Sequence, residues 1–399
     1  MVANGVTTSF SVIFIALLAE FGSSRAELSS IFSLYILVFF CGGGLAGLLL
    51  DRIGPRRLIP LGSVLIGLGL FSCSRISSLY QLYLYYGLIT AIGTCCISWV
   101  PSSVIITNWF WRRRGLAVGI VMCGNGLGLM VFLPLTQFLT SWLGWRSAFL
   151  VIAAIAVFII APLNAVFQRT RPEDKDLDGE PIDALLAKRE EGYKKSLGKS
   201  GRLWALSEAL REKSFWMICL ASFFNPFFTF SITLHQVTLV VGRGFTPTAV
   251  AATLGFVGIF AMVGRITGGM LSDRMGREWA YNLFMSFAAF GVISLFFLNA
   301  NCSWVLLIYV MFIGLGLGVG GAMFPPMIAD LFPGPSLGRI IGITSIFAGL
   351  GAGSGSWLVG YIHDLTGSYL WSLCCMLVAI GAAVVSVWIA APRQARRFS

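Results

Sequence analysis

The amino-acid sequence predicts an all-α integral membrane protein with twelve transmembrane helices, arranged as two related six-helix bundles. Three observations support this fold class: a strongly apolar composition, a series of long apolar segments, and a charged turn that occurs twice. Of the 399 residues, 57% are hydrophobic and 11% are charged, and the mean hydropathy is +0.85. This composition excludes a water-soluble globular protein, in which charged residues are far more frequent.

Twelve apolar segments are long enough to cross a bilayer, which requires about 20 helical residues. We expect membrane-spanning helices at about residues 1–20, 28–50, 58–76, 79–108, 115–140, 147–168, 214–241, 247–271, 280–299, 303–328, 338–362 and 368–391. The first of them opens at Met1 with no polar residues before it, which we interpret as a late start that omits the first turns of this helix.

A charged turn is found at corresponding places in the two parts of the chain. GLLLDRIGPRR runs from Gly47 to Arg57, and GMLSDRMGR runs from Gly269 to Arg277; each one ends a long apolar segment. Such a repeat is typical of transporters built from two parallel repeats. We therefore expect an N-terminal bundle at 1–168, a cytoplasmic linker at 169–213, a C-terminal bundle at 214–391 and a cytoplasmic tail at 392–399.

The basic residues predict how the protein lies in the membrane. Nearly all of the 28 Lys and Arg residues fall in alternate loops, and the opposite loops hold only Arg25, Arg75, Arg146 and Arg243. Basic loops stay in the cytoplasm, so both termini and the linker are expected there, in a multi-pass protein of the cell membrane. The net charge of +11 then reflects topology and the lipid bilayer, and no nucleic-acid partner is implied.

One arginine, Arg265, lies well inside a predicted membrane span, about six residues or ~9 Å from its end. Burying an arginine in hydrocarbon costs at least about 2.5–3.5 kcal/mol, so its side chain should face the bundle interior or water. Its guanidinium stays charged and offers a planar pair of donors that suits a carboxylate. A buried acidic partner is not predicted, because no Asp or Glu lies deep in any span. Snorkelling of the side chain to the cytoplasmic face is the alternative.

Several sequence segments resemble the monocarboxylate transporter family of the major facilitator superfamily. They are FGSSRAELSSIFS, WFWRRRGLAVGI, LGWRSAFL, RPEDKDLDGEP, LHQVTLVVGRGFTPTAVAA and GRITGGMLSDR. The resemblance implies the major facilitator fold and alternating-access transport of a small monocarboxylate such as lactate or pyruvate, without a cofactor. It also places the family's substrate-binding arginine at Arg265. The family's helix 8 acid, which is tied to proton coupling, falls on Ala261 here, and its helix 1 lysine falls near Thr8. Coupling to protons therefore stays open, and a uniporter or an exchanger is also permitted.

Two other transport functions stay open. Oxalate–formate antiporters are similar but carry a lysine in helix 11, whereas IIGITSIFAGLGAG has none, which favours a monoanion. The other alternative is efflux of a different small organic compound. An enzyme is not predicted, because paired carboxylates and a nucleophile with a nearby base are not found. The nine cysteines show no metal-ligand spacing, so no metal site is predicted.

Further polar and aromatic residues are candidates for the substrate cavity, with packing as the alternative for each. They are His235, Thr8, Asn125, Asn225, Phe347 and Trp99. His235 could bind a carboxylate or carry a proton. Counting along the helices nevertheless separates His235 from Arg265 by about 20 Å in depth, so the two are not expected to share one ligand. His363, beside Asp364, is expected in an ion pair of an outer loop.

The repeated turns also predict a mechanical element. We expect Asp51 and Asp273 to accept hydrogen bonds at the N-termini of neighbouring helices. The arginines around them would bridge the cytoplasmic helix ends and form a latch that breaks on inward opening. An alternative is that the turns only determine topology. The latch residues are Gly47, Asp51, Arg52, Arg57, Gly269, Asp273, Arg274 and Arg277.

Overall fold

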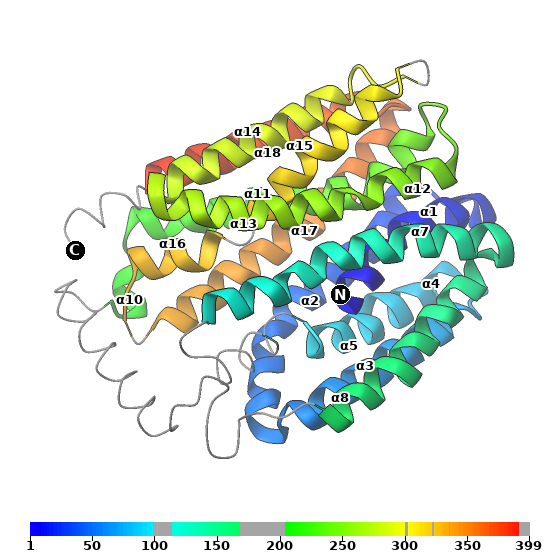
Figure 1. The fold of residues 1–399 in the computed structure, drawn as a ribbon, viewed down its shortest axis with the longest axis horizontal. Helices are drawn as coiled ribbons and strands as arrows, with labels where there is room; N and C mark the ends of the chain where they lie inside the picture. Colours follow the sequence, from blue (N-terminus) through cyan, green and yellow to red (C-terminus); the bar gives the residue numbers. More distant parts are fainter. Residues whose placement is uncertain are drawn as a thin grey trace.

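The structure is a computed structural model. It describes residues 1–98, 102, 114–167, 204–299, 302–320, 323–334 and 336–390, and in these ranges every regular element is a helix. Figure 1 shows the helices lying side by side along the long axis in two groups, with the N-terminal half below and the C-terminal half above. Predicted segments outside these ranges, which include Trp99 and most of the linker, are not described.

The N-terminal half contains the first six predicted spans. Its elements are α1 (Val2–Phe21), α2 (Arg25–Ile53), α3 (Pro55–Cys73), α4 (Leu79–Leu82), the π-helix η1 (Tyr83–Thr90), α5 (Ala91–Cys96), α7 (Arg114–Ala154), the π-helix η2 (Ile155–Ile160) and α8 (Ala161–Phe167). Within α7, Gly144 has φ 80° and bends the helix. The predicted spans 115–140 and 147–168 are therefore two helices that meet at this glycine.

The C-terminal half contains the other six spans. Its elements are α10 (Leu206–Ala209), α11 (Lys213–Val241), α12 (Pro247–Gly255), α13 (Val257–Met275), α14 (Arg277–Ser294), α15 (Trp304–Gly320), α16 (Phe324–Leu331), α17 (Leu337–Thr366) and α18 (Leu370–Ala390). In the described ranges, nine helical stretches are long and apolar enough to span a membrane, and one of these, Cys123–Phe167, includes the bend at Gly144. The predicted fold class is confirmed.

The two charged turns have the same backbone conformation. Gly54, between α2 and α3, has φ 74° and ψ 161°, and Gly276, between α13 and α14, has φ 95° and ψ 155°. A side chain is strongly disfavoured in this region of φ and ψ, so glycine is required at both places. The repeated sequence thus builds the same turn in each half. We call the end of the molecule that carries Gly54 and Gly276 the turn end, and the opposite end, with Arg25 and Asp364, the far end.

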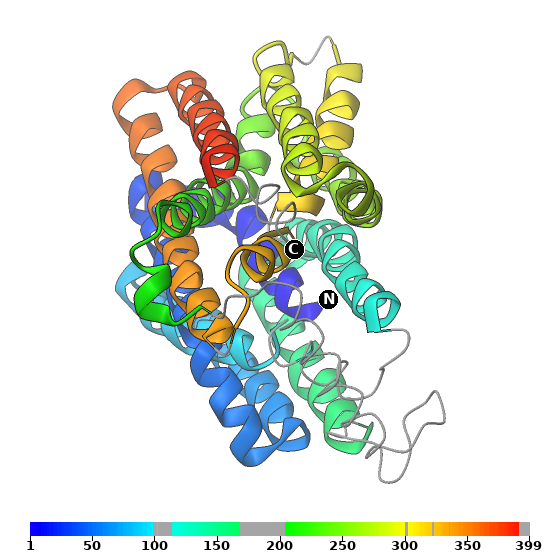
Figure 2. The same ribbon diagram turned by 90° about the vertical axis from the view of Figure 1, so that its left-hand side faces the viewer.

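Several pairs of helices join the halves, and two of these contacts can be followed in the views. Figure 2, viewed from the turn end, shows α17 beside α2 on one side and α7 beside α13 on the other. At the second contact the backbones touch, because a Cβ on Gly126 would lie 2.4 Å from the Gly258 carbonyl oxygen and a Cβ on Gly258 would lie 2.1 Å from that of Gly126. Glycines also allow α17 to approach α2, since a Cβ on Gly360 would lie 2.7 Å from Ser29 Oγ. Small residues at such crossings are typical of membrane helices.

The turn conformation gives a first testable prediction. Gly276→Ala should destabilise the folded protein by about 1–3 kcal/mol, because alanine does not adopt this backbone conformation without strain. The purified protein should therefore unfold at a lower temperature in a thermal melt. Gly381→Ala is the matched control, because Gly381 is helical in α18 and a Cβ there would meet nothing within 4 Å. An equal effect of the two substitutions would contradict the prediction.

Candidate functional site

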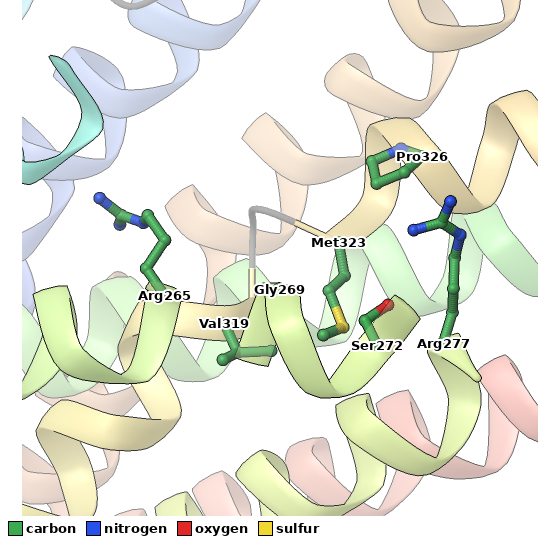
Figure 3. A pocket seen from close by; sticks show the side chains of 7 residues that line it. All are labelled: Arg265, Gly269, Ser272, Arg277, Val319, Met323 and Pro326. Carbon is green, nitrogen blue, oxygen red and sulfur yellow. The ribbon is translucent and has the colours of Figure 1, made fainter. Parts of the chain in front are cut away.

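A cavity of about 230 Å³ lies in the C-terminal half and reaches the turn end. Its walls come from α13, the first residue of α14, α15, α16 and the residue just before α16. The lining residues, shown in Figure 3, are Arg265, Gly269, Ser272, Arg277, Val319, Met323 and Pro326. The structure thus brings the predicted substrate-binding arginine into one cavity with Gly269 and Arg277 of the second charged turn.

Arg265 is held by a close contact between α13 and α15. Its Nε donates a hydrogen bond to the carbonyl oxygen of Gly318 at 3.2 Å. A Cβ on Gly318 would lie 2.8 Å from the backbone nitrogen of Arg265, so only glycine lets α15 come this close. The side chain is half-buried. Figure 3 shows its guanidinium directed away from Ser272 and Arg277, and therefore away from the turn end to which a snorkelling side chain would reach.

Arg277 lies at the other end of the cavity and is paired with an acidic residue. Its Nε donates to Asp330 Oδ2, and its second terminal nitrogen is 3.4 Å from Asp330 Oδ1. Asp330 belongs to α16, and the sequence did not single it out because it falls just past the predicted span at 303–328. Figure 3 shows the Arg277 guanidinium directed towards α16, the helix that carries Asp330.

Among the described residues, none of the other latch residues shows a contact between the two halves. Arg52, Arg57 and Arg274 are exposed at the turn end. A Cβ on either Gly47 or Gly269 would meet nothing within 4 Å. The side chains of Asp51 and Asp273 lie outside the described residues, so the predicted hydrogen bonds of these two acids stay a prediction.

Four other candidate residues do not line the cavity. Thr8 Oγ1 donates to carbonyl oxygens of its own helix, those of Asn4 and Gly5. Asn125 accepts a hydrogen bond from Asn4 through its backbone oxygen at 2.7 Å. Asn225 is buried, with Nδ2 3.5 Å from Met285 Sδ. The ring of Phe347 packs edge-on against Trp216. The contact of Thr8 stays within its own helix and the other three residues contact neighbouring helices, and none of the four is among the residues that line the cavity with Arg265.

His235 is fully buried between the two halves near the far end. Its Nε2 lies 3.0 Å from the Ser356 carbonyl oxygen and 3.3 Å from Ser29 Oγ of α2. On the other side of the ring, Nδ1 lies 3.4 Å from the Tyr369 hydroxyl. The Ser356 carbonyl oxygen can only accept a hydrogen bond, so Nε2 donates to it, and the Tyr369 hydroxyl then donates to Nδ1. The network therefore assigns the proton of a neutral imidazole to Nε2. His235 and Arg265 do not share a site.

Asp364 caps a helix of the opposite half. Its carboxylate accepts the backbone N–H groups of Arg25 at 3.1 Å and Ala26 at 2.7 Å, at the N-terminus of α2. An anion is favoured there by the unpaired N–H groups and by the helix dipole. The Arg25 guanidinium contacts His363 Nε2 and lies over the Tyr369 ring, 5.1 Å from its centroid. His363 and Asp364 thus both bind the first turn of α2.

The chain forms membrane-spanning helices in two halves that carry the same turn, and a cavity with an arginine lies inside one half. This is the architecture of a multi-pass membrane transporter. A family model of the Major Facilitator Superfamily matches residues 1–326, and the chain belongs to that superfamily. Its relatives are transporters, and the chain is not an enzyme.

Two curated relatives are similar over most of their length. Monocarboxylate transporter 13 of Rattus norvegicus is 27% identical over 370 residues, which cover 92% of this chain and 80% of the relative. Monocarboxylate transporter 2 of Homo sapiens is 26% identical over 379 residues, with 92% and 78% covered. Among solved structures, a D-xylose–proton symporter has a TM-score of 0.71 at 15% identity and covers 98% of this chain and 95% of its own, which is a likeness of fold.

The helix cap made by Asp364 gives a second prediction. Asp364→Asn should speed hydrogen–deuterium exchange in the first turn of α2 roughly five- to tenfold, because hydrogen bonds to a charged acceptor are worth about 1.5–3 kcal/mol and the amide retains part of this. Mass spectrometry of peptides that contain Arg25 and Ala26 measures it. Glu27→Gln, which neutralises an exposed carboxylate in the same turn, should change this exchange much less. Equal exchange in wild type and Asp364→Asn would show that the cap does not hold the halves together.

Proposed function

We propose that this transporter carries a small monocarboxylate, such as lactate or pyruvate, by alternating access, and that Arg265 binds the carboxylate. The observation that carries the proposal is the position of Arg265, half-buried in a cavity inside the membrane-spanning part of the chain. The monocarboxylate transporters among its relatives support the same substrate class.

The size of the cavity supports a small solute. At about 230 Å³ it is smaller than the roughly 300–1,000 Å³ of sites for drug-sized ligands. Val319, Met323 and Pro326 form an apolar wall that suits a short carbon chain. The arginine supplies a permanent positive charge and paired N–H donors for the carboxylate. These features favour a small anion over the efflux of a large or cationic compound.

Charge neutralisation gives the proposal a mechanism. The permanent positive charge of an arginine is costly in the low-dielectric interior of a membrane. When a carboxylate binds, the pair is neutral, and the halves can change orientation at a smaller cost. Binding of substrate would thus favour the movement that carries it across.

The contacts between the halves support a state that is closed at the far end. The excess of positive residues in its loops favours a cytoplasmic location of the turn end. In the described ranges, α2 is joined to α11 and α17 at the far end by Arg25, Ser29 and Ser33, the last of which donates to the Gly353 carbonyl oxygen at 2.6 Å. The cavity, in contrast, reaches the turn end. Outward opening would break the far-end contacts and close the turns, which would then act as the latch.

Transport measurements on one substitution test the proposal. Arg265→Ala should lower the initial rate of lactate or pyruvate uptake at least about tenfold, because hydrogen bonds to a charged group contribute about 1.5–3 kcal/mol. Labelled lactate, pyruvate and oxalate are offered to vesicles that contain equal amounts of folded protein. Arg75→Ala is the control, because it removes an exposed arginine of a far-end loop. Uptake of each anion by Arg265→Ala at the wild-type rate would refute the assignment.

The same vesicles distinguish the coupling modes. A proton uncoupler should abolish accumulation by a symporter, whereas exchange against internal anion should persist. Faster uptake of oxalate than of lactate and pyruvate by wild type would favour an exchanger of the oxalate–formate type.

A further inference from the structure

We propose a second anion-binding position in the cavity, formed by Ser272 and Arg277, at which a small carboxylate rests between the cytoplasm and Arg265. The inference rests on the proposed function, because it assigns the path by which the same substrate class reaches the same arginine. Three observations support it: the state of the Ser272 hydroxyl, the alignment of residues along α13, and the geometry of the Arg277 ion pair.

The Ser272 hydroxyl is buried in the cavity wall and lacks a hydrogen-bond partner among the described residues. Ser272 is 3% exposed, and its Oγ is among the buried polar atoms without a partner. Hydroxyl groups in helices commonly bond to the carbonyl four residues earlier, as Thr267 does with Val263 at 2.7 Å. An unpaired buried hydroxyl is costly, which indicates that a ligand or water normally occupies this position. Figure 3 shows the hydroxyl oxygen directed towards the side of Arg277.

Three lining residues form one row along α13. Arg265, Gly269 and Ser272 are spaced by four and three residues, so they lie on the same face of the helix. Seven residues of helix separate the arginine from the serine by about 10 Å along the axis. Gly269 lies between them, and a Cβ there would meet nothing within 4 Å. The row thus offers a polar group at each end and an open surface between, along which a small anion can move.

Arg277 supplies the positive charge of the second position. Asp330 engages the Nε and one terminal nitrogen of its guanidinium. A guanidinium has five N–H donors, so the pair with Asp330 leaves donors for another oxyanion. The carboxylate of Asp330 also reduces the net positive charge, which makes this position weaker than Arg265. A site through which a ligand passes must bind it weakly, because the ligand must be able to leave.

Anion binding in the absence of Arg265 tests the proposal most directly. Purified Arg265→Gln protein should still be stabilised against thermal unfolding by sodium pyruvate relative to sodium chloride, because the second position is intact. Adding Ser272→Ala should raise the half-maximal pyruvate concentration about three- to tenfold, as expected for the net contribution of one typical hydrogen bond. Adding Thr267→Ala instead should leave it unchanged, because the Thr267 hydroxyl is bonded within its own helix and does not line the cavity.

A second measurement applies to protein with Arg265 intact. Gly269→Leu places a bulky side chain between the two positions, so it should abolish pyruvate uptake by vesicles while pyruvate still stabilises the purified protein. Ser272→Ala alone should slow uptake about three- to tenfold.

The outcomes separate this inference from the proposed function. If wild type carries pyruvate or lactate but Ser272→Ala changes neither pyruvate binding nor uptake, the second position is wrong and the carrier assignment stands. The second position is also refuted if Arg265→Gln protein shows no stabilisation by pyruvate. If wild type transports none of the monocarboxylates, the proposed function fails.

Discussion

The close contact of α13 with α15 is the constraint on which the site depends. Glycines at these crossings bring backbone against backbone: a Cβ on Gly264 would lie 2.4 Å from the Leu315 carbonyl oxygen, and one on Gly318 would lie 2.2 Å from that of Ala261. The close approach of the two helices allows the Gly318 carbonyl oxygen of α15 to accept a hydrogen bond from Arg265 Nε. This bond fixes the position of the guanidinium at its Nε atom. A charged group in a membrane interior requires such fixed polar contacts, because water cannot replace them there.

The two ends of the molecule are held in different ways. At the far end, groups of the C-terminal half bind the start of α2, and both the Asp364 cap and the Ser29–His235 contact join the halves. At the turn end, the described ion pair of Arg277 with Asp330 and the hydrogen bond of Arg56 to the Ala165 carbonyl oxygen each stay within one half. The halves can therefore separate at the turn end without breaking either contact, which agrees with a cavity that opens there.

The sequence predicted the fold well because its signals are local. Apolar length gives the spans, and the repeated turn contains the glycine that its backbone conformation requires. It also placed Arg265 correctly inside a span and His235 away from it. Ser272 and Asp330 were missed because their importance depends on which helices face α13. A serine next to a charged turn has no sequence feature that marks it as a candidate site residue. Conversely, Thr8 and Asn225 are polar residues in apolar spans whose contacts within the protein satisfy them, and polarity in a sequence does not reveal this.

The far-end network is suited to a contact that must break and re-form. When α2 leaves Asp364, its first N–H groups become accessible to water, and Ser24 still caps the Glu27 N–H at 3.1 Å. The cost of opening is therefore limited to exchanging protein partners for water, because exposed N–H groups are hydrated. His235 differs, since its ring is surrounded by Phe14, Ser29 and Tyr369 and loses a packed environment when the halves part. Opening would expose this imidazole to water and add the loss of its packing to the cost of separating the halves.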